Sequence, residues 1–253
     1  MLSRTAIKHS LLTVMLSCML LPTLAQTRFL STGKIEFEKK TNMHKWIEDN
    51  AWTRELKDRL PPYRVQYYDL MFDSTKTFYR RGREVPDDKW KDFWGSSGGE
   101  EDVVLHNLMA MQSTAYKQVF EKKFLVQDSA LNIEWRITDE TRTIAGFDCR
   151  KAVGKFFDSL YVVAFYTDQI AVPGGPELYN GLPGMILGLA FPRYYITWFA
   201  TKVELVEPKM NELKIPSGKT TKVNRKELMD QVRKVFEWGT EEERQRVFWN
   251  TVL

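Results

Sequence analysis

The sequence predicts a single α+β domain dominated by an antiparallel β-sheet, a curved sheet or half-barrel, with N-terminal and C-terminal helices packed against it. Three observations support this prediction. Apolar and polar residues alternate with period two through the middle of the chain, as in strands with one buried face. The alternating segments follow one another through short connections, which favours antiparallel pairing. Segments with the apolar spacing of helices lie mainly toward the ends.

The strand pattern recurs along most of the chain. It covers residues 34–38, 64–68, 76–80, 132–137, 148–157, 160–167, 185–190 and 194–206. The last of these segments is long, aromatic and β-branched, which suits a central position in the sheet. The dipeptide at 158–159 is Asp-Ser, typical of a tight turn, and predicts a hairpin between the segments on either side of it.

Helices are predicted over 41–60, 103–120, 224–238 and 241–249. Pro61 and Pro62 end the first. Asn224 can cap the third and Gly239 can end it. Between the first two predicted helices, residues 92–102 are rich in glycine, serine and acidic side chains, which predicts an exposed loop.

The N-terminal segment has the pattern of an export signal. A basic start at Arg4 and Lys8 precedes an apolar run, and the segment ends at Ala25, a small residue suited to signal peptidase. This predicts a signal peptide over 1–25 and a domain over 26–253. Lipidation at Cys18 is the alternative to cleavage after Ala25. No other segment is apolar enough to cross a membrane, so the mature chain is expected to be exported without a transmembrane segment.

Composition argues against several functional classes. Without residues 1–25 the chain keeps 35 Lys and Arg against 33 Asp and Glu, so the basic excess expected of a nucleic-acid partner is missing. Cys149 is the only cysteine left, which excludes an internal disulfide, and its strand setting favours a buried thiol. Histidines and cysteines are not spaced as metal ligands, so we expect no metal and no cofactor.

The segment from Gly175 to Leu189 combines glycine and proline punctuation with an apolar run. The prolines fix φ, and glycines allow backbone conformations closed to other residues, so the segment is built to hold one shape. We predict that Leu182 inserts into the core and that residues 185–189 continue as a strand. The residues expected to specify this structure are Gly175, Pro176, Gly181, Pro183 and Gly184.

The hexapeptide Gly181-Leu182-Pro183-Gly184-Met185-Ile186 resembles the signature of the GLPGLI family of exported Bacteroidota proteins, with Met185 in place of leucine. The resemblance extends over 120–206, including the strand around Trp135, the segment around Cys149 and the aromatic-Tyr-Thr element at 165–167. The family has no established biochemical activity. The resemblance implies export, and it implies a gene often encoded near TonB-dependent transporters.

Aromatic and loop side chains are the candidate binding residues. They are Tyr179, Asn180, Leu182, Trp94 and Trp198. Tyr179 and Asn180, as polar or aromatic neighbours of the glycine and proline positions, are expected to form a functional surface. Three further serines, Ser74, Ser129 and Ser159, follow aspartate in a pattern that resembles the acceptor of general O-glycosylation in Bacteroidota. The Asp-Ser dipeptide is also common in ordinary turns.

Two functional hypotheses follow. The favoured one is a non-enzymatic protein of the periplasm or outer membrane that binds an envelope partner, or an apolar ligand or peptide. Given the resemblance, a TonB-dependent transporter is the specific partner to test. The alternative is a hydrolase or thiol enzyme that uses Cys149 with His44 or His106, for which the cysteine and a histidine must lie within hydrogen-bonding reach.

Overall fold

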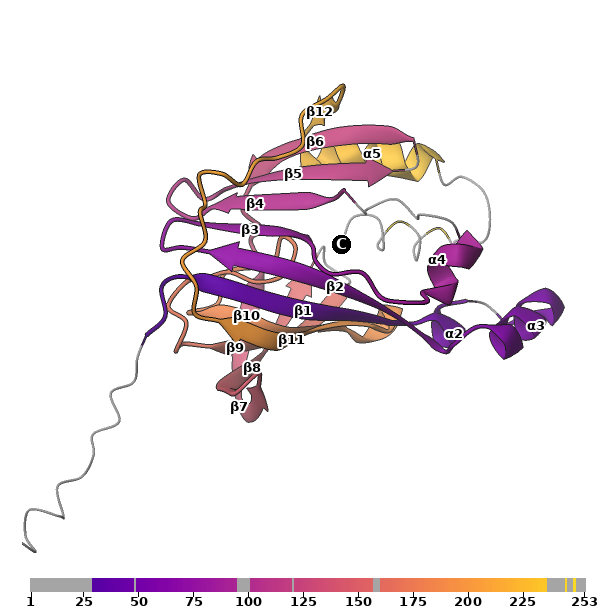
Figure 1. Ribbon diagram of the computed structural model, residues 1–253, viewed down its shortest axis with the longest axis horizontal. Helices are drawn as coiled ribbons and strands as arrows, with labels where there is room; N and C mark the ends of the chain where they lie inside the picture. Colours follow the sequence, from indigo (N-terminus) through magenta and orange to yellow (C-terminus); the bar gives the residue numbers. More distant parts are fainter. Residues whose placement is uncertain are drawn as a thin grey trace, which may run out of the picture.

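The computed structural model describes residues 29–47, 49–94, 101–119, 121–156 and 160–235, together with 244 and 248. The described strands form one 12-stranded sheet in the order β12-β6-β5-β4-β3-β2-β1-β11-β10-β9-β8-β7 (Figure 1). All neighbours pair antiparallel except β12 and β6, which are parallel. The predicted sheet-dominated α+β fold is confirmed. The predicted signal peptide, the residues 95–100 of the predicted loop and the turn at 158–159 lie outside the described residues.

The strands have the following bounds: β1 Gly33–Asn42, β2 Tyr63–Phe72, β3 Lys76–Arg81, β4 Val103–Asn107, β5 Gln112–Val119, β6 Lys122–Ser129, β7 Glu134–Ile144, β8 Phe147–Phe156, β9 Leu160–Thr167, β10 Met185–Phe191, β11 Ile196–Glu204 and β12 Thr221–Val223. The helices are α2 Met43–Trp46, α3 Ala51–Arg59, α4 Lys89–Trp94 and α5 Arg225–Val235, with a 3-10 turn η1 at Pro192–Tyr194.

The sheet is strongly curved, as two contacts of the loop between β9 and β10 require. Glu177 pairs with Lys117 on β5, and the carbonyl of Asn180 accepts a hydrogen bond from Trp135 on β7. In a flat sheet these strands, nine steps apart in the order, would be separated by about 43 Å. Three residues of chain span at most about 11 Å. Since side-chain length cannot make up the difference, the sheet must curl around the loop, and it remains open between β7 and β12.

The middle strand β1 shows why the sheet has an inside and an outside. Its residues alternate strictly between buried and half-buried over ten positions. Ile35 and Phe37 point into the core between β2 and β11 and are fully buried. Lys39 and Thr41 continue the same inward row, so the interior is polar toward one end of β1.

The helices lie around the sheet. The helix predicted over 224–238 is confirmed up to Val235 as α5, which begins after the Asn224 side chain accepts a hydrogen bond from the Glu227 amide and packs against β6 and β12. Residues 236–239, with the predicted end at Gly239, lie outside the described residues. The helix predicted over 41–60 is replaced by the end of β1, the short α2 and then α3, which begins at a capping box formed by Asn50 and Thr53. Helices α2 to α4 gather at one end of the strands (Figure 1). Of the helix predicted over 241–249 only Arg244 and Phe248 are described, and both are helical.

The helix predicted over 103–120 is wrong, because this segment is the hairpin of β4 and β5. The apolar residues that suggested a helical period include Met109, which is 79% exposed in the connection. The strands themselves point polar side chains inward, among them His106 and Lys117. Because polar side chains occupy inward positions, apolar and polar residues do not alternate clearly in this segment, and the strands could not be recognised from the hydrophobicity pattern.

The β7–β8 hairpin offers a test of local turn chemistry. Ala145 and Gly146 connect the strands with φ of 49° and 85°, the positive pair of a type I′ turn. Asparagine adopts positive φ more readily than alanine. We therefore expect Ala145→Asn to stabilise the protein by about 0.5–1 kcal/mol in urea unfolding. Ala145→Val should destabilise it, and equal stabilities for the two variants would contradict this account.

Candidate functional site

The glycine- and proline-rich segment lies inside the curved sheet, between β9 and β10. Its backbone is fixed by backbone hydrogen bonds, including those from the Gly184 amide to the Leu182 carbonyl (2.8 Å) and from the Ile186 amide to the Gly174 carbonyl (2.8 Å). Leu182 is 2% exposed and belongs to the main hydrophobic cluster, as predicted. We call residues 172–184 the signature loop. It contacts β3, β5 and β7, and therefore fills the concave side of the sheet.

Two glycines of this loop have backbone conformations that other residues avoid. Gly181 has φ of 92° and Gly184 has φ of 146°. A Cβ atom at Gly184 would lie 2.1 Å from the carbonyl oxygen of Thr167, whereas at Gly181 the nearest atom would be 3.5 Å away, on Trp135. Gly184 is therefore required by both conformation and close backbone contact.

The candidate binding residues are mostly interior, which corrects the expectation that Tyr179 and Asn180 form a surface. Tyr179 is 1% exposed and Asn180 is 6% exposed. The Tyr179 ring packs on Phe191, and Phe191 packs edge-on against Trp198, which is itself fully buried. Together with Leu182, these aromatic side chains belong to the hydrophobic core, because the loop directs its large side chains into the curved sheet. Trp94 ends α4, and its side chain lies outside the described part of the structure.

A buried ion cluster joins the signature loop to the sheet. The Lys117 ammonium lies 3.1 Å from a Glu177 carboxylate oxygen and 3.3 Å from one of Asp102. Burial alone would lower the pKa of Lys117, but the two carboxylates raise it. Burial raises the pKa of Asp102, with a further contribution from Glu177. Glu177 also has φ of 53°, so the loop holds a non-glycine residue in a left-handed conformation at this contact.

A second buried lysine has no carboxylate in contact among the described residues. Lys39 is 8% exposed, and its ammonium lies 4.6 Å from the centre of the Trp198 ring. Burial lowers the pKa of Lys39 to about 8. Glu177 opposes this shift and Lys117 adds to it. Lys39 is thus a destabilising charge in the interior, partly offset by the aromatic face beneath it.

We expect Lys39→Met to stabilise the protein at pH 7 by about 1–2 kcal/mol, since methionine fills similar volume without a buried charge. A lysine whose pKa falls from 10.5 to about 8 on folding weakens the native state below pH 8. This cost is relieved as the pH rises from 8 to 10.5. The stability difference between Lys39→Met and the unsubstituted protein should shrink over that range in urea unfolding. The outward-facing Lys34→Met is the control. If Lys34→Met stabilised the protein as much as Lys39→Met, or if the gain from Lys39→Met did not change with pH, the assignment of Lys39 as a destabilising buried charge would be contradicted.

The thiol-enzyme alternative gains no support. Cys149 is fully buried on β8, its thiol donates to the Phe147 carbonyl at 3.5 Å, and burial raises its pKa to about 12. His106 lies on β4, whereas Cys149 lies on β8. Burial lowers the pKa of His106 to about 4, so it is neutral near pH 7. His44 lies in α2, where its Nε2 contacts the Leu60 carbonyl at 3.0 Å.

Metal ligation and modification give no further candidate centre. No group of three or more His, Cys, Asp or Glu side chains gathers as a metal site in the described part of the chain. Ser74 and Ser129 are exposed, and Ser159 lies outside the described residues. Asp73 accepts hydrogen bonds from the Thr75 and Lys76 amides, so the turn interpretation holds there. O-glycosylation of these serines stays a prediction.

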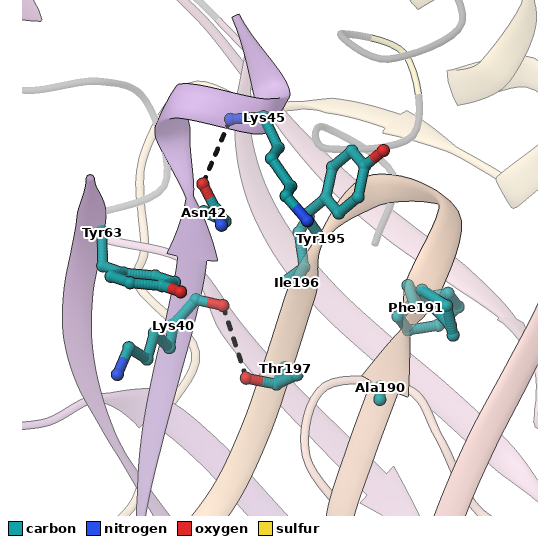
Figure 2. Close-up of a pocket in the computed structure, with 10 residues that line it drawn as sticks. Lys40, Asn42, Lys45, Tyr63, Ala190, Phe191, Tyr195, Ile196 and Thr197 are labelled. Atoms are coloured by element: carbon teal, nitrogen blue, oxygen red, sulfur yellow. Dashed lines mark hydrogen bonds between the residues drawn. The ribbon is translucent and has the colours of Figure 1, made fainter. Parts of the chain in front are cut away.

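A pocket of about 240 Å³ opens on the outer side of the sheet, where the ends of β1, β10 and β11 meet (Figure 2). Lys40 and Asn42 come from β1, and Lys45 comes from α2. Tyr63, at the start of β2, and Tyr195, between η1 and β11, stand at its edge and are 44% and 43% exposed. Each tyrosine ring has a lysine ammonium over it, Lys40 at 4.5 Å and Lys45 at 5.4 Å from the ring centres. This basic aromatic pocket is the candidate binding site.

Sequence reasoning missed both the ion cluster and the basic aromatic pocket. A lysine in the inward row of β1 was a usable signal for Lys39, because residues 33–42 alternate so regularly. Lys117 was hidden by the wrong helix over 103–120. The pocket draws on three segments far apart in sequence, and no local pattern links them.

Among the described residues, no helix has the length and apolar character needed to cross a bilayer. Residues 154–188, which include the signature loop, match a family model described as a protein of unknown function (Porph_ging). A search of curated proteins finds no match.

Solved structures of PNGF-II resemble this fold. The structure in the C2 space group aligns with a TM-score of 0.53 and 16% identity, covering 79% of this chain and 32% of PNGF-II. The structure in the P21 space group gives 0.52 and 17%, covering 79% of this chain and 33% of PNGF-II. The chain thus spans about a third of the length of PNGF-II. At this identity the likeness concerns the fold alone.

Proposed function

We propose that this protein is a non-enzymatic accessory protein of the bacterial envelope that binds a protein partner. The observation that carries the proposal is the use of the signature loop as internal structure. Tyr179, Leu182 and Glu177 are all at most 5% exposed, and the loop is tied to β5 through Lys117. The concave side, where a curved sheet would hold a substrate, is occupied by the protein's own chain.

The chemistry of the described residues agrees with a binding role. The ionisable groups of the interior are engaged with one another or shifted by burial toward their neutral forms, as in His106 and Cys149. The basic aromatic pocket on the outer side is accessible and offers two tyrosine side chains, a residue type enriched at protein interfaces, together with lysine ammonium groups. Binding through the convex surface is therefore the arrangement we favour.

The envelope setting rests on the sequence. The predicted signal peptide would direct the mature protein to the periplasm or the outer membrane, and the resemblance to GLPGLI proteins supports an outer-membrane transporter as the partner to test. On this view the protein stabilises or positions a TonB-dependent transporter without chemistry of its own.

The test is recovery of the partner from cells that express the full chain with a C-terminal tag. Envelope fractions are crosslinked, solubilised in mild detergent and purified through the tag, with an unrelated exported protein carrying the same tag as control. We expect an outer-membrane protein to copurify with this chain and not with the control. Return of the protein alone, both with and without crosslinking, rejects the proposal.

A further inference from the structure

The outward row of β1 shows which charges this face leaves unmatched. Lys34 pairs with Asp69 at 3.1 Å, Glu36 with Arg83 at 2.9 Å, and Glu38 accepts a hydrogen bond from a tyrosine hydroxyl. Lys40 is next in the row, and the described residues place no carboxylate against it. The pattern of matched charges therefore stops at the basic aromatic pocket.

Two neighbours extend this unmatched donor group. Lys45 also has no carboxylate partner in the described part of the chain, and its ammonium rests over Tyr195. The Asn42 side-chain oxygen accepts a hydrogen bond from the Lys45 amide at 3.1 Å, which leaves the Asn42 NH₂ group to donate (Figure 2). The Lys45 ammonium and the Asn42 amide group thus lie on one side of the pocket, and the Lys40 ammonium lies on its other side, over the Tyr63 ring (Figure 2). These unmatched positive charges favour an anionic occupant.

The conformation of Tyr195 is a separate observation at the same pocket. Tyr195 has φ of 56° and ψ of 35°, a left-handed conformation that is strained for a bulky residue. Its carbonyl accepts a hydrogen bond from the Asn42 amide at 2.9 Å, which ties the turn to β1. The turn holds an aromatic ring beside Lys45 at a site where glycine would be more stable.

The size of the pocket limits the occupant. At about 240 Å³ it is smaller than the roughly 300–1,000 Å³ of pockets for whole small molecules, so it suits one side-chain-sized group. Ala190 and Pro192 add apolar lining to the pocket. A C-terminal residue carries a carboxylate and a side chain on the same carbon atom, matching an apolar pocket bordered by ammonium groups. A glutamate side chain, by contrast, ends in its carboxylate and has no separate apolar group to fill the pocket.

We infer that the basic aromatic pocket binds the C-terminal residue of a protein partner, with the terminal carboxylate between Lys40 and Lys45 and a large apolar side chain in the pocket. This inference rests on the proposed function, since it assigns the chemistry by which the partner is recognised. Capture of a C-terminal carboxylate is a known mode of peptide recognition.

The test uses three fluorescent peptides with a Gly-Ser body and the full chain. One ends in phenylalanine with a free carboxylate, the second is its C-terminal amide, and the third is amidated but carries glutamate beside the phenylalanine. We expect the free acid to bind at least about tenfold more tightly than the amide in anisotropy titrations, as for a lost charged hydrogen bond. The difference should shrink as salt rises. Equal binding of acid and amide overturns the inference, and equal binding of the third peptide overturns the terminal assignment.

Variants connect the binding to the pocket. Lys40→Met and Lys45→Met should each remove most of the preference for the free acid, while Lys34→Met, on the same face but paired with Asp69, should leave it unchanged. Tyr195→Gly should keep or raise the melting temperature while weakening binding severalfold. That result separates recognition from folding. A Lys40→Met/Lys45→Met variant that is folded and still prefers the free acid rejects the site.

The two proposals fail in different ways. If the free acid binds as expected but no envelope protein copurifies, the pocket assignment stands and the accessory role fails. If a partner copurifies equally with the Lys40→Met/Lys45→Met variant, the accessory role stands and the pocket is not its docking site.

Discussion

Gly184→Ala is expected to leave little folded protein, at a cost of at least about 4 kcal/mol. The residue has φ of 146°, a region almost reserved for glycine. The added Cβ would also lie 2.1 Å from the Thr167 carbonyl oxygen and 2.8 Å from its carbon, both backbone atoms. Neither can move without disturbing β9, which pairs with β10 through Thr167 and Met185. Soluble yield and urea unfolding of the purified chain measure the effect.

Two other glycines separate strain from contact. Gly181→Ala places a residue at φ of 92° with its nearest neighbour 3.5 Å away, and Gly146→Ala does so at φ of 85° with no atom within 4 Å. Each should cost about 1–3 kcal/mol, the cost of the conformation alone. If Gly184→Ala costs no more than these two, the close backbone contact does not determine the choice of glycine.

The sheet was predictable where each strand has a distinct inner and outer face. Residues 34–38 and 64–68 were recognised because apolar and polar residues alternate, and both segments lie in the middle of the sheet. Leu182 was predicted to be buried from the glycines and prolines around it, since a rigid turn leading to an apolar run must enter the core. These features depend on residues close together in the chain, so they can be predicted from the sequence.

What could not be predicted depends on contacts between distant segments. The Glu177–Lys117 pair joins residues 60 positions apart, and neither shows an unusual local pattern. Tyr179 and Asn180 were predicted to form a functional surface as polar or aromatic neighbours of the glycine- and proline-rich turn, yet the curvature of the sheet places them inside. The basic aromatic pocket likewise exists only once β1, β10 and β11 lie side by side.

Glu177→Gln is expected to destabilise the protein by about 3–4 kcal/mol at pH 7, because it removes one of two carboxylates from a buried ammonium. Lys117 is 5% exposed and Glu177 is also 5% exposed, so water cannot replace the lost charge. The substitution preserves size and the left-handed backbone at position 177, so the change reports the charge itself. Urea unfolding at pH 7 measures it, with Glu84→Gln, in a surface pair to Lys91 at 3.5 Å, as the matched control.

Lys117→Met tests the same cluster from the other side. It removes the ammonium that contacts both Glu177 and Asp102. The pKa of Asp102, which burial already raises, should therefore rise further. A carboxyl whose pKa is higher folded than unfolded takes up a proton on folding, so this variant should gain stability as the pH falls below neutrality. Combined with Glu177→Gln it should lose less than the sum of the two single losses, by about 1–3 kcal/mol. Strict additivity, or a Lys117→Met variant whose stability changes with pH in the same way as that of the unsubstituted protein, would mean that the pair does not hold the signature loop in the sheet.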